Sequence, residues 1–253
     1  MTAIVAAALV AGAANGVGPL ARVTAPGQVT DPREMLARSL QSVIDASSVH
    51  VEITLTGRVP GALLGRSAAA VDLDGTRTSL DIRPQDARSH LELSSPGLGL
   101  HLEAVTSWDT MAYRLAAGAW SQGSLGSVLA GSGIDANPLT LVDRLRAWLA
   151  APGAPVPAAT TVACDAPSGL CRRVALSLGP AVGDVLLKAL HADGAARVGA
   201  TTTDVVLLAD AATLQPVHVT LAVHNADATL AATVHIDATS WNAPSVIADP
   251  PSG

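Results

Sequence analysis

Residues 49–58 read Val-His-Val-Glu-Ile-Thr-Leu-Thr-Gly-Arg, with apolar and polar side chains in strict alternation. Successive side chains of a β-strand point to opposite faces of its sheet, so this alternation predicts a strand with one dry face and one wet face. The pattern recurs between short segments rich in glycine and proline, which predicts one large antiparallel sheet. Further strands are predicted around residues 71–73, 80–82, 91–93, 98–102, 174–178, 205–207, 217–223 and 230–236.

The composition limits both the interior and the partners of this protein. Hydrophobic residues make up 49% of the 253 residues, but aromatic residues make up only 2% and phenylalanine is absent. We therefore expect an interior lined by Ala, Val, Leu and Ile. The formal charge is −6 and Lys188 is the only lysine. No basic stripe exists of the kind that phosphate backbones require, so we expect no nucleic-acid partner.

The N-terminal segment has the composition of an export signal. Residues 4–14 are an apolar run that is too short to span a bilayer but has the length of a signal-peptide h-region; the alternative is a disordered leader rich in Ala and Gly. Residues 9–12, Leu-Val-Ala-Gly, would suit the start of a lipobox, but the next residue is Ala13. We expect membrane anchoring only if the native residue at this position is Cys. Residues 1–24 are thus interpreted as a signal-peptide-like segment and tether, and residues 25–253 as a single domain.

Only three helices are predicted, against about ten strands. Asp31 and Pro32 open the first helix as cap and first helical residue, and two others are predicted to begin near Asn137 and Gly179. Residues 121–136 contain four glycines and are predicted to form a loop. A broad sheet curls, and a curled sheet under few helices leaves an apolar cavity. The predicted fold class is therefore α+β, a large curved antiparallel sheet with helices that cover its concave face around an apolar cavity.

The residues at the apolar positions of the alternation are the predicted lining of this cavity, together with three residues of the second predicted helix. A close-packed core would explain each of them equally well one by one. The candidate lipid-binding residues are Val51, Ile53, Leu55, Val71, Leu73, Leu80, Ile82, Leu91, Leu93, Leu100, Leu102, Leu141, Leu145, Trp148, Val205, Leu207, Val219 and Leu221.

The two cysteines enclose a turn. A two-residue turn at Pro167-Ser168 would place Cys164 opposite Cys171, within disulfide range, and export would supply the oxidising conditions. The alternatives are two buried thiols in a cytosolic protein, or half of a metal site that lacks two ligands.

Catalytic and metal chemistry find little support in the pattern. Six histidines (His50, His90, His101, His218, His224, His235) have the parity of the wet face, and His191 lies near a helix C-terminus, so we expect surface histidines and no metal site. No Gly-x-Ser-x-Gly elbow or phosphate-binding loop occurs. Asp72 with Asp74, or Glu92 with Glu103, would be the acid/base pairs to consider, but all have polar parity or lie in turns. We expect no enzyme and no cofactor.

The order of several motifs resembles a known family. Residues 108–113 read Trp-Asp-Thr-Met-Ala-Tyr, Trp120 follows, residues 210–216 read Asp-Ala-Ala-Thr-Leu-Gln-Pro, and Trp241 precedes three prolines. Over about residues 30–250 the chain resembles the LppX/LprG lipoproteins, which share the LolA-like half-barrel. The resemblance implies an apolar cavity between a curved sheet and its helices, and transport of multi-acylated lipids or lipoglycans across the cell envelope. The missing anchor cysteine and the pair Cys164/Cys171 depart from the family.

These observations lead to one principal hypothesis, a monomeric carrier that acts in the cell envelope or periplasm or is secreted. It would hold the acyl chains of a lipid or glycolipid in its cavity, with the loop 121–137 and the helix 138–150 at the mouth, and a membrane surface or a transporter would be the transfer partner. The alternative is an envelope sensor or scaffold of the same fold that binds a protein partner through a packed sheet. An enzyme acting on envelope lipids is a third hypothesis.

Overall fold

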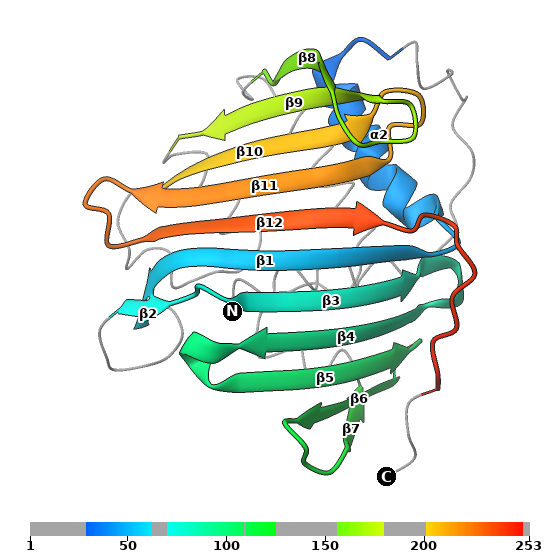
Figure 1. Cartoon of the computed structure of the whole chain (residues 1–253), viewed down its shortest axis with the longest axis vertical. Coiled ribbons are helices and arrows are strands. Elements are labelled where there is room, and N and C mark those ends of the chain that lie inside the picture. Colours follow the sequence, from blue (N-terminus) through cyan, green and yellow to red (C-terminus); the bar gives the residue numbers. More distant parts are fainter. Residues whose placement is uncertain (1–28, 62–69, 109, 125–155, 180–200, 250–253) are drawn as a thin grey trace.

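A computed structural model describes residues 29–61, 70–108, 110–124, 156–179 and 201–249. The twelve strands of these residues lie in one broad antiparallel sheet that remains unclosed (Figure 1). Its order is β7-β6-β5-β4-β3-β1-β12-β11-β10-β9-β8, with β2 paired to β1. The strands are β1 Val49–Pro60, β2 Ala70–Asp72, β3 Thr76–Arg83, β4 Arg88–Ser95, β5 Leu100–Ser107, β6 Thr110–Leu115, β7 Ser121–Ser124, β8 Ala158–Ala163, β9 Leu170–Leu178, β10 Thr201–Asp210, β11 Pro216–Asn225 and β12 Ala231–Thr239.

The stretch 49–58 forms the middle of the sheet, as its alternation predicts. Strand β1 pairs with β3 on one side and with β12 on the other, so Ile53 faces both Thr78 and Ile236. Ile53 and Leu80 are fully buried on the apolar face. The side chains that form the first core cluster around them are Val49, Val51, Ile53, Leu55, Val59, Val71, Leu73, Leu80, Ile82, Leu230, Ala232 and Val234.

Strand β1 changes its partner where Gly57 interrupts the alternation. A Cβ atom at this residue would lie 2.1 Å from the Ala231 carbonyl oxygen, and the backbone has a φ of +99°. Glycine alone fits both conditions. Beyond it, β1 pairs with β2 instead of β3.

The helix α2 (Pro32–Asp45) begins as the sequence predicts. Asp31 caps it by accepting a hydrogen bond from the Arg33 amide, and Pro32 occupies the first turn. Met35 and Leu36 pack with Leu207 and Leu214 in a second core cluster, so the helix lies against the apolar face at strands β9 to β11 (Figure 1). The other two predicted helices, within 138–150 and 180–191, lie outside the described residues. Helical cover of a cavity thus stays a prediction.

The predicted disulfide joins Cys164 and Cys171, with 5.8 Å between their Cα atoms. The turn at Pro167-Ser168 is also confirmed, because the Gly169 amide donates to the Ala166 carbonyl. The predicted register is wrong. Cys171 pairs with Val162, and β8 ends one residue before Cys164, because the left-handed backbone of Gly169 shifts the pairing after the turn.

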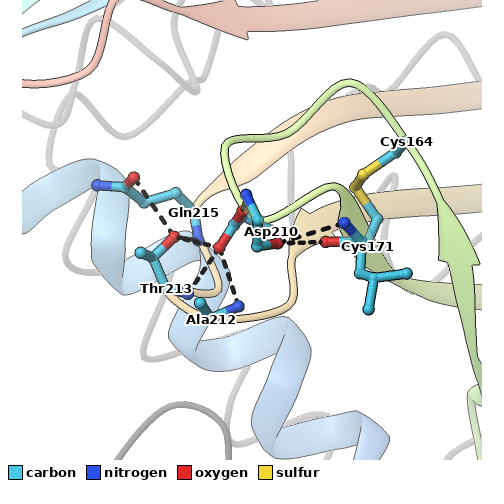
Figure 2. The surroundings of a disulfide bond; sticks show 8 residues. Cys164, Cys171, Asp210, Ala212, Thr213 and Gln215 are labelled. Carbon is cyan, nitrogen blue, oxygen red and sulfur yellow. Dashed lines mark hydrogen bonds between the residues drawn. A yellow bond between two sulfur atoms is a disulfide. The ribbon is translucent and has the colours of Figure 1, made fainter.

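The segment after β10 owes its conformation to one carboxylate, which explains the Asp-x-x-Thr-Leu-x-Pro pattern. Asp210, 2% exposed, accepts hydrogen bonds from the amides of Ala212 and Thr213 and from the Thr213 hydroxyl (Figure 2). It also accepts a hydrogen bond from the Ser168 amide. Leu214 then adopts a left-handed backbone and is buried beside α2. One side chain thus ties the β10–β11 loop to the disulfide loop.

Residues 242–249 run along the ends of the central strands, with Arg83 and Arg88 donating to the carbonyls of Ser245 and Ile247 (Figure 1). The predicted loop 121–136 is wrong at its start, where residues 121–124 form β7. In this short strand Gly123 lies opposite Met111 of β6.

Asp210 gives a stability test with a defined pH dependence. Although burial opposes ionisation, the hydrogen bonds from Ser168, Thr213 and Ala212 lower the pKa of Asp210 to about 2. A lowered pKa stabilises the fold above the ordinary value of 3.8, and this stabilisation is lost as the pH falls towards 2. Asp210→Ala is expected to lower the free energy of unfolding by about 1–3 kcal/mol at neutral pH, because three amides lose their acceptor.

Urea denaturation at neutral pH and at about pH 2.5 measures this effect. The difference between wild type and Asp210→Ala is expected to shrink at the lower pH, whereas Asp165→Ala, in the exposed part of the disulfide loop, serves as the control. A difference that stays constant with pH would contradict a role of the ionised carboxylate.

Candidate functional site

The predicted lining residues that the structure describes all lie on the apolar side of the sheet, but they differ in exposure. Half of the predicted set is buried and offers no surface: Val51, Ile53, Leu55, Val71, Leu73, Leu80, Ile82, Leu93 and Leu207. Their packing matches the alternative that each residue is an ordinary core residue. The remaining described candidates are half-buried, and three others (Leu141, Leu145, Trp148) lie outside the described residues.

Half-buried apolar residues form a continuous strip over β10, β11 and β12. Val205 faces Leu221, and Val219 faces both Leu207 and Ile236, so these side chains are neighbours across three strands. Val219 packs against the second core cluster, and Leu221 and Ile236 pack against the first. We call this set the inner strip: Val205, Val219, Leu221, Val223 and Ile236.

A second half-buried group lies on the same face over β4, β5 and β6. Leu91 and Tyr113 both face Ala104, and Leu102 faces Leu93. The group consists of Leu91, Leu100, Leu102, Met111 and Tyr113. The prediction missed Met111 and Tyr113 here, and Val223 and Ile236 in the inner strip, although the same alternation marks all four.

Two solvent-open cavities border the described strands. One, of about 390 Å³, is lined at the end of β1 by residues that include His50, Asp81 and Ser245; the other, of about 300 Å³, is lined by residues that include Arg58, Asp72 and Asp74. Polar and charged groups border both of them. Neither is the predicted apolar cavity, which therefore stays a prediction.

The opposite face of the sheet carries histidines between carboxylates. His50, His90, His218 and His235 are half-buried there, and His101 and His224 are exposed, as their parity predicts; His191 lies outside the described residues. Glu52 lies directly opposite Asp237, and Glu92 directly opposite Glu103. Like charges in such positions repel each other, so the neighbouring histidines and Arg114 compensate for them.

His50 bridges two carboxylates through its two ring nitrogens. Its Nδ1 lies 2.8 Å from Asp81, and its Nε2 lies 3.0 Å from Glu52. Although partial burial opposes protonation, the hydrogen bonds to Asp81 and Glu52 raise the pKa of His50. The protonated ring donates to both acids and holds β1 to β3 on this face.

The acid pairs considered for catalysis have structural partners. Asp74, in the turn before β3, accepts the Gly57 amide, and Asp72 accepts the Asp74 amide. Glu103 accepts from the Arg114 guanidinium at 2.6 Å. Although burial opposes ionisation, hydrogen bonds from Arg114 and His90 lower the pKa of Glu103.

Trp108 and Trp120 of the motif series lie near the β6–β7 edge of the sheet, whereas Trp241 packs against the first core cluster. Trp108 is 63% exposed at the turn before β6 and has a left-handed backbone. The Arg114 guanidinium stacks over the Trp120 ring, 4.9 Å from its centroid. Trp108 and Trp120 thus lie outside the apolar lining, whereas Tyr113 belongs to the half-buried group on the apolar face.

Comparison of the fold with solved structures gives a clear likeness. The crystal structure of Mycobacterium tuberculosis lipoprotein LppX superposes with a TM-score of 0.51 at 16% sequence identity, over 86% of this chain and 98% of that chain. The fold is of the LppX type. A LolA superfamily protein from Nitrosomonas europaea also matches, over 86% of this chain and 96% of its own at 10% identity, with a TM-score of 0.31. No family model and no curated protein matches the sequence.

The LppX-like sheet agrees with the resemblance drawn from the motifs. At this low identity the likeness concerns the fold alone, as a large, curved, unclosed antiparallel sheet. Among the helices that the structure describes, none has the length and apolar character needed to cross a membrane.

The bridge at His50 leads to a pH-dependent stability difference. Because the pKa of His50 is raised on folding, protonation of His50 stabilises the fold. This stabilisation is fully present below the unfolded-state pKa of about 6.5, and it is lost as the pH rises through the folded-state pKa. His50→Gln is therefore expected to destabilise the protein more at pH 5.5 than at pH 9. Thermal unfolding of wild type and variant at both pH values measures this, with His101→Gln, an exposed histidine of the same face, as the control. A larger difference at pH 9 would contradict the bridge.

Proposed function

We propose that this chain is an exported lipid carrier that holds acyl chains against the inner strip. The observation that supports the proposal most is the incomplete burial of a continuous row of Val, Leu and Ile side chains across three strands. A sheet built only for packing would bury such residues fully, as it does at Ile53 and Leu80. The apolar surface that remains suits an apolar ligand.

The chemistry of the strip favours hydrocarbon over a polar ligand. Val, Leu and Ile side chains offer no hydrogen-bonding groups, so affinity comes from removing apolar surface from water. Each buried methylene contributes about 0.8 kcal/mol, and a long acyl chain needs no polar contact to bind. The ionisable groups described above, from His50 to Glu103, lie on the opposite face.

Export is supported by the disulfide. A bond between Cys164 and Cys171 forms and persists under oxidising conditions outside the cytoplasm. The fold points the same way, because LppX, whose sheet this chain shares, is a lipoprotein. We propose an extracytoplasmic protein of the cell envelope, or a secreted one, that acts as a non-enzymatic carrier of a lipid or glycolipid.

Native mass spectrometry after gentle purification tests carriage directly. We expect an added mass that organic extraction removes and that is identified as a lipid with long acyl chains. An empty protein that also ignores fluorescent acyl probes would refute carriage. A protein that instead forms a stable complex with an envelope protein through this face would favour the scaffold alternative.

A substitution in the inner strip tests where the chains bind. Leu221→Asn places a polar amide among apolar neighbours, and losing the contact of about two methylenes weakens binding about tenfold. Because Leu221 is half-buried, most of the protein is expected to stay folded, which circular dichroism checks. Titration with a fluorescent fatty acid measures the affinity.

The matched control is Ala222→Asn, which puts the same amide on the same strand but on the other face. It is expected to bind the probe within about twofold of wild type, a difference of about 0.4 kcal/mol. An equal loss of probe affinity in Leu221→Asn and Ala222→Asn would show that the acyl chain does not bind at the inner strip.

A further inference from the structure

Three side chains on the polar face direct ligand atoms towards one point. His90 Nε2 lies 3.3 Å from Glu103 Oε1 and 3.7 Å from Glu92 Oε1, and the three ligand atoms all lie within 4.8 Å of one another. His90 and Glu92 are two residues apart on β4, and Glu103 faces Glu92 from β5. Strand pairing alone therefore brings one imidazole and two carboxylates together.

These contacts differ from those of the other histidines on the face. His50 uses opposite ring nitrogens for its two carboxylates, at 2.8 and 3.0 Å, which a proton on each nitrogen explains. His218 has one carboxylate partner, Asp237, on Nδ1, and its Nε2 contacts Thr220. His90 presents a single nitrogen to both acids: Glu103 lies within hydrogen-bond distance of it, and Glu92, at 3.7 Å, lies beyond that distance. One N–H serves only one of the two carboxylates, whereas a shared cation would serve both.

The distances match a coordination sphere. Zinc binds imidazole nitrogen and carboxylate oxygen at about 2.0–2.2 Å, so two ligands of a tetrahedral ion lie about 3.4 Å apart. The two separations from His90 Nε2 bracket this value. The Arg114 guanidinium holds Oε2 of Glu103, which leaves Oε1 turned towards His90.

We propose that His90, Glu92 and Glu103 form a binding site for Zn²⁺, with water completing the coordination. A divalent cation would also remove the repulsion between the facing carboxylates of Glu92 and Glu103. The imidazole ligand selects a transition metal over Ca²⁺ or Mg²⁺, which prefer oxygen ligands alone. This proposal departs from the expectation of no metal site, which rested on the flatness of the face, and it is independent of lipid carriage.

Isothermal titration of the full chain with ZnCl₂ tests the site. We expect one Zn²⁺ to bind per chain, with His90 as a ligand. Both cysteines are in the disulfide, so no free thiol competes for the metal. His90→Gln and Glu92→Gln are each expected to weaken binding at least about tenfold. His50→Gln and His218→Gln are the matched controls and are expected to bind Zn²⁺ as the wild type does. Circular dichroism shows whether each variant is folded.

Co²⁺ provides a second readout, since its visible absorption reports the coordinating groups and is expected to vanish in His90→Gln. The proposal is overturned if folded wild type binds no Zn²⁺ at millimolar concentration. It is also overturned if His218→Gln loses as much affinity as His90→Gln, or if Ca²⁺ displaces Zn²⁺ at equal concentration.

Discussion

The two-residue period of the β-strand is the constraint on which this structure depends. Because β1 alternates strictly, its apolar residues share one face with those of β3 and β12, and register extends that face from strand to strand. An unclosed sheet of this width has a large apolar surface to cover. The helix α2 covers only part of it, near Leu207 and Leu214. Within the described residues, the centre of this face is fully buried and the inner strip is half-buried.

The same period creates an electrostatic problem on the other face. Polar residues of neighbouring strands come into direct opposition, and here carboxylates oppose carboxylates, as Glu52 and Asp237 do. The sheet resolves each case with different chemistry. His50 hydrogen-bonds Asp81 on β3 and Glu52 on its own strand. Arg114 pairs with Glu103, whereas His90 offers one nitrogen to two acids. Histidines at similar positions of the alternation, such as His50 and His90, thus contact their carboxylate partners in different ways.

The sequence was informative wherever local periodicity decides the outcome. It predicted the faces of β1, the cap of α2 and the disulfide partners. It did not predict which lining residues stay accessible: Leu91 and Leu93 have the same parity, yet Leu91 is half-buried and Leu93 is buried, because exposure depends on what packs over each strand. The predicted register at Cys171 is wrong because the left-handed Gly169 shifts the strand pairing by two residues, which the local alternation does not reveal.

The likeness to LppX at 16% identity follows from the same physics. A sheet face requires apolar side chains at alternate positions, but it does not require particular ones, so parity persists where identity is lost. The particular side chains set the shape of the apolar surface. In this chain, which has no phenylalanine, the inner strip consists of branched aliphatic residues without an aromatic ring. Such a surface makes many weak contacts of similar strength and none with a fixed direction. In the proposed carrier, any preference for one lipid over another would then arise from the length and branching of the acyl chains, or from polar groups at the border of the strip.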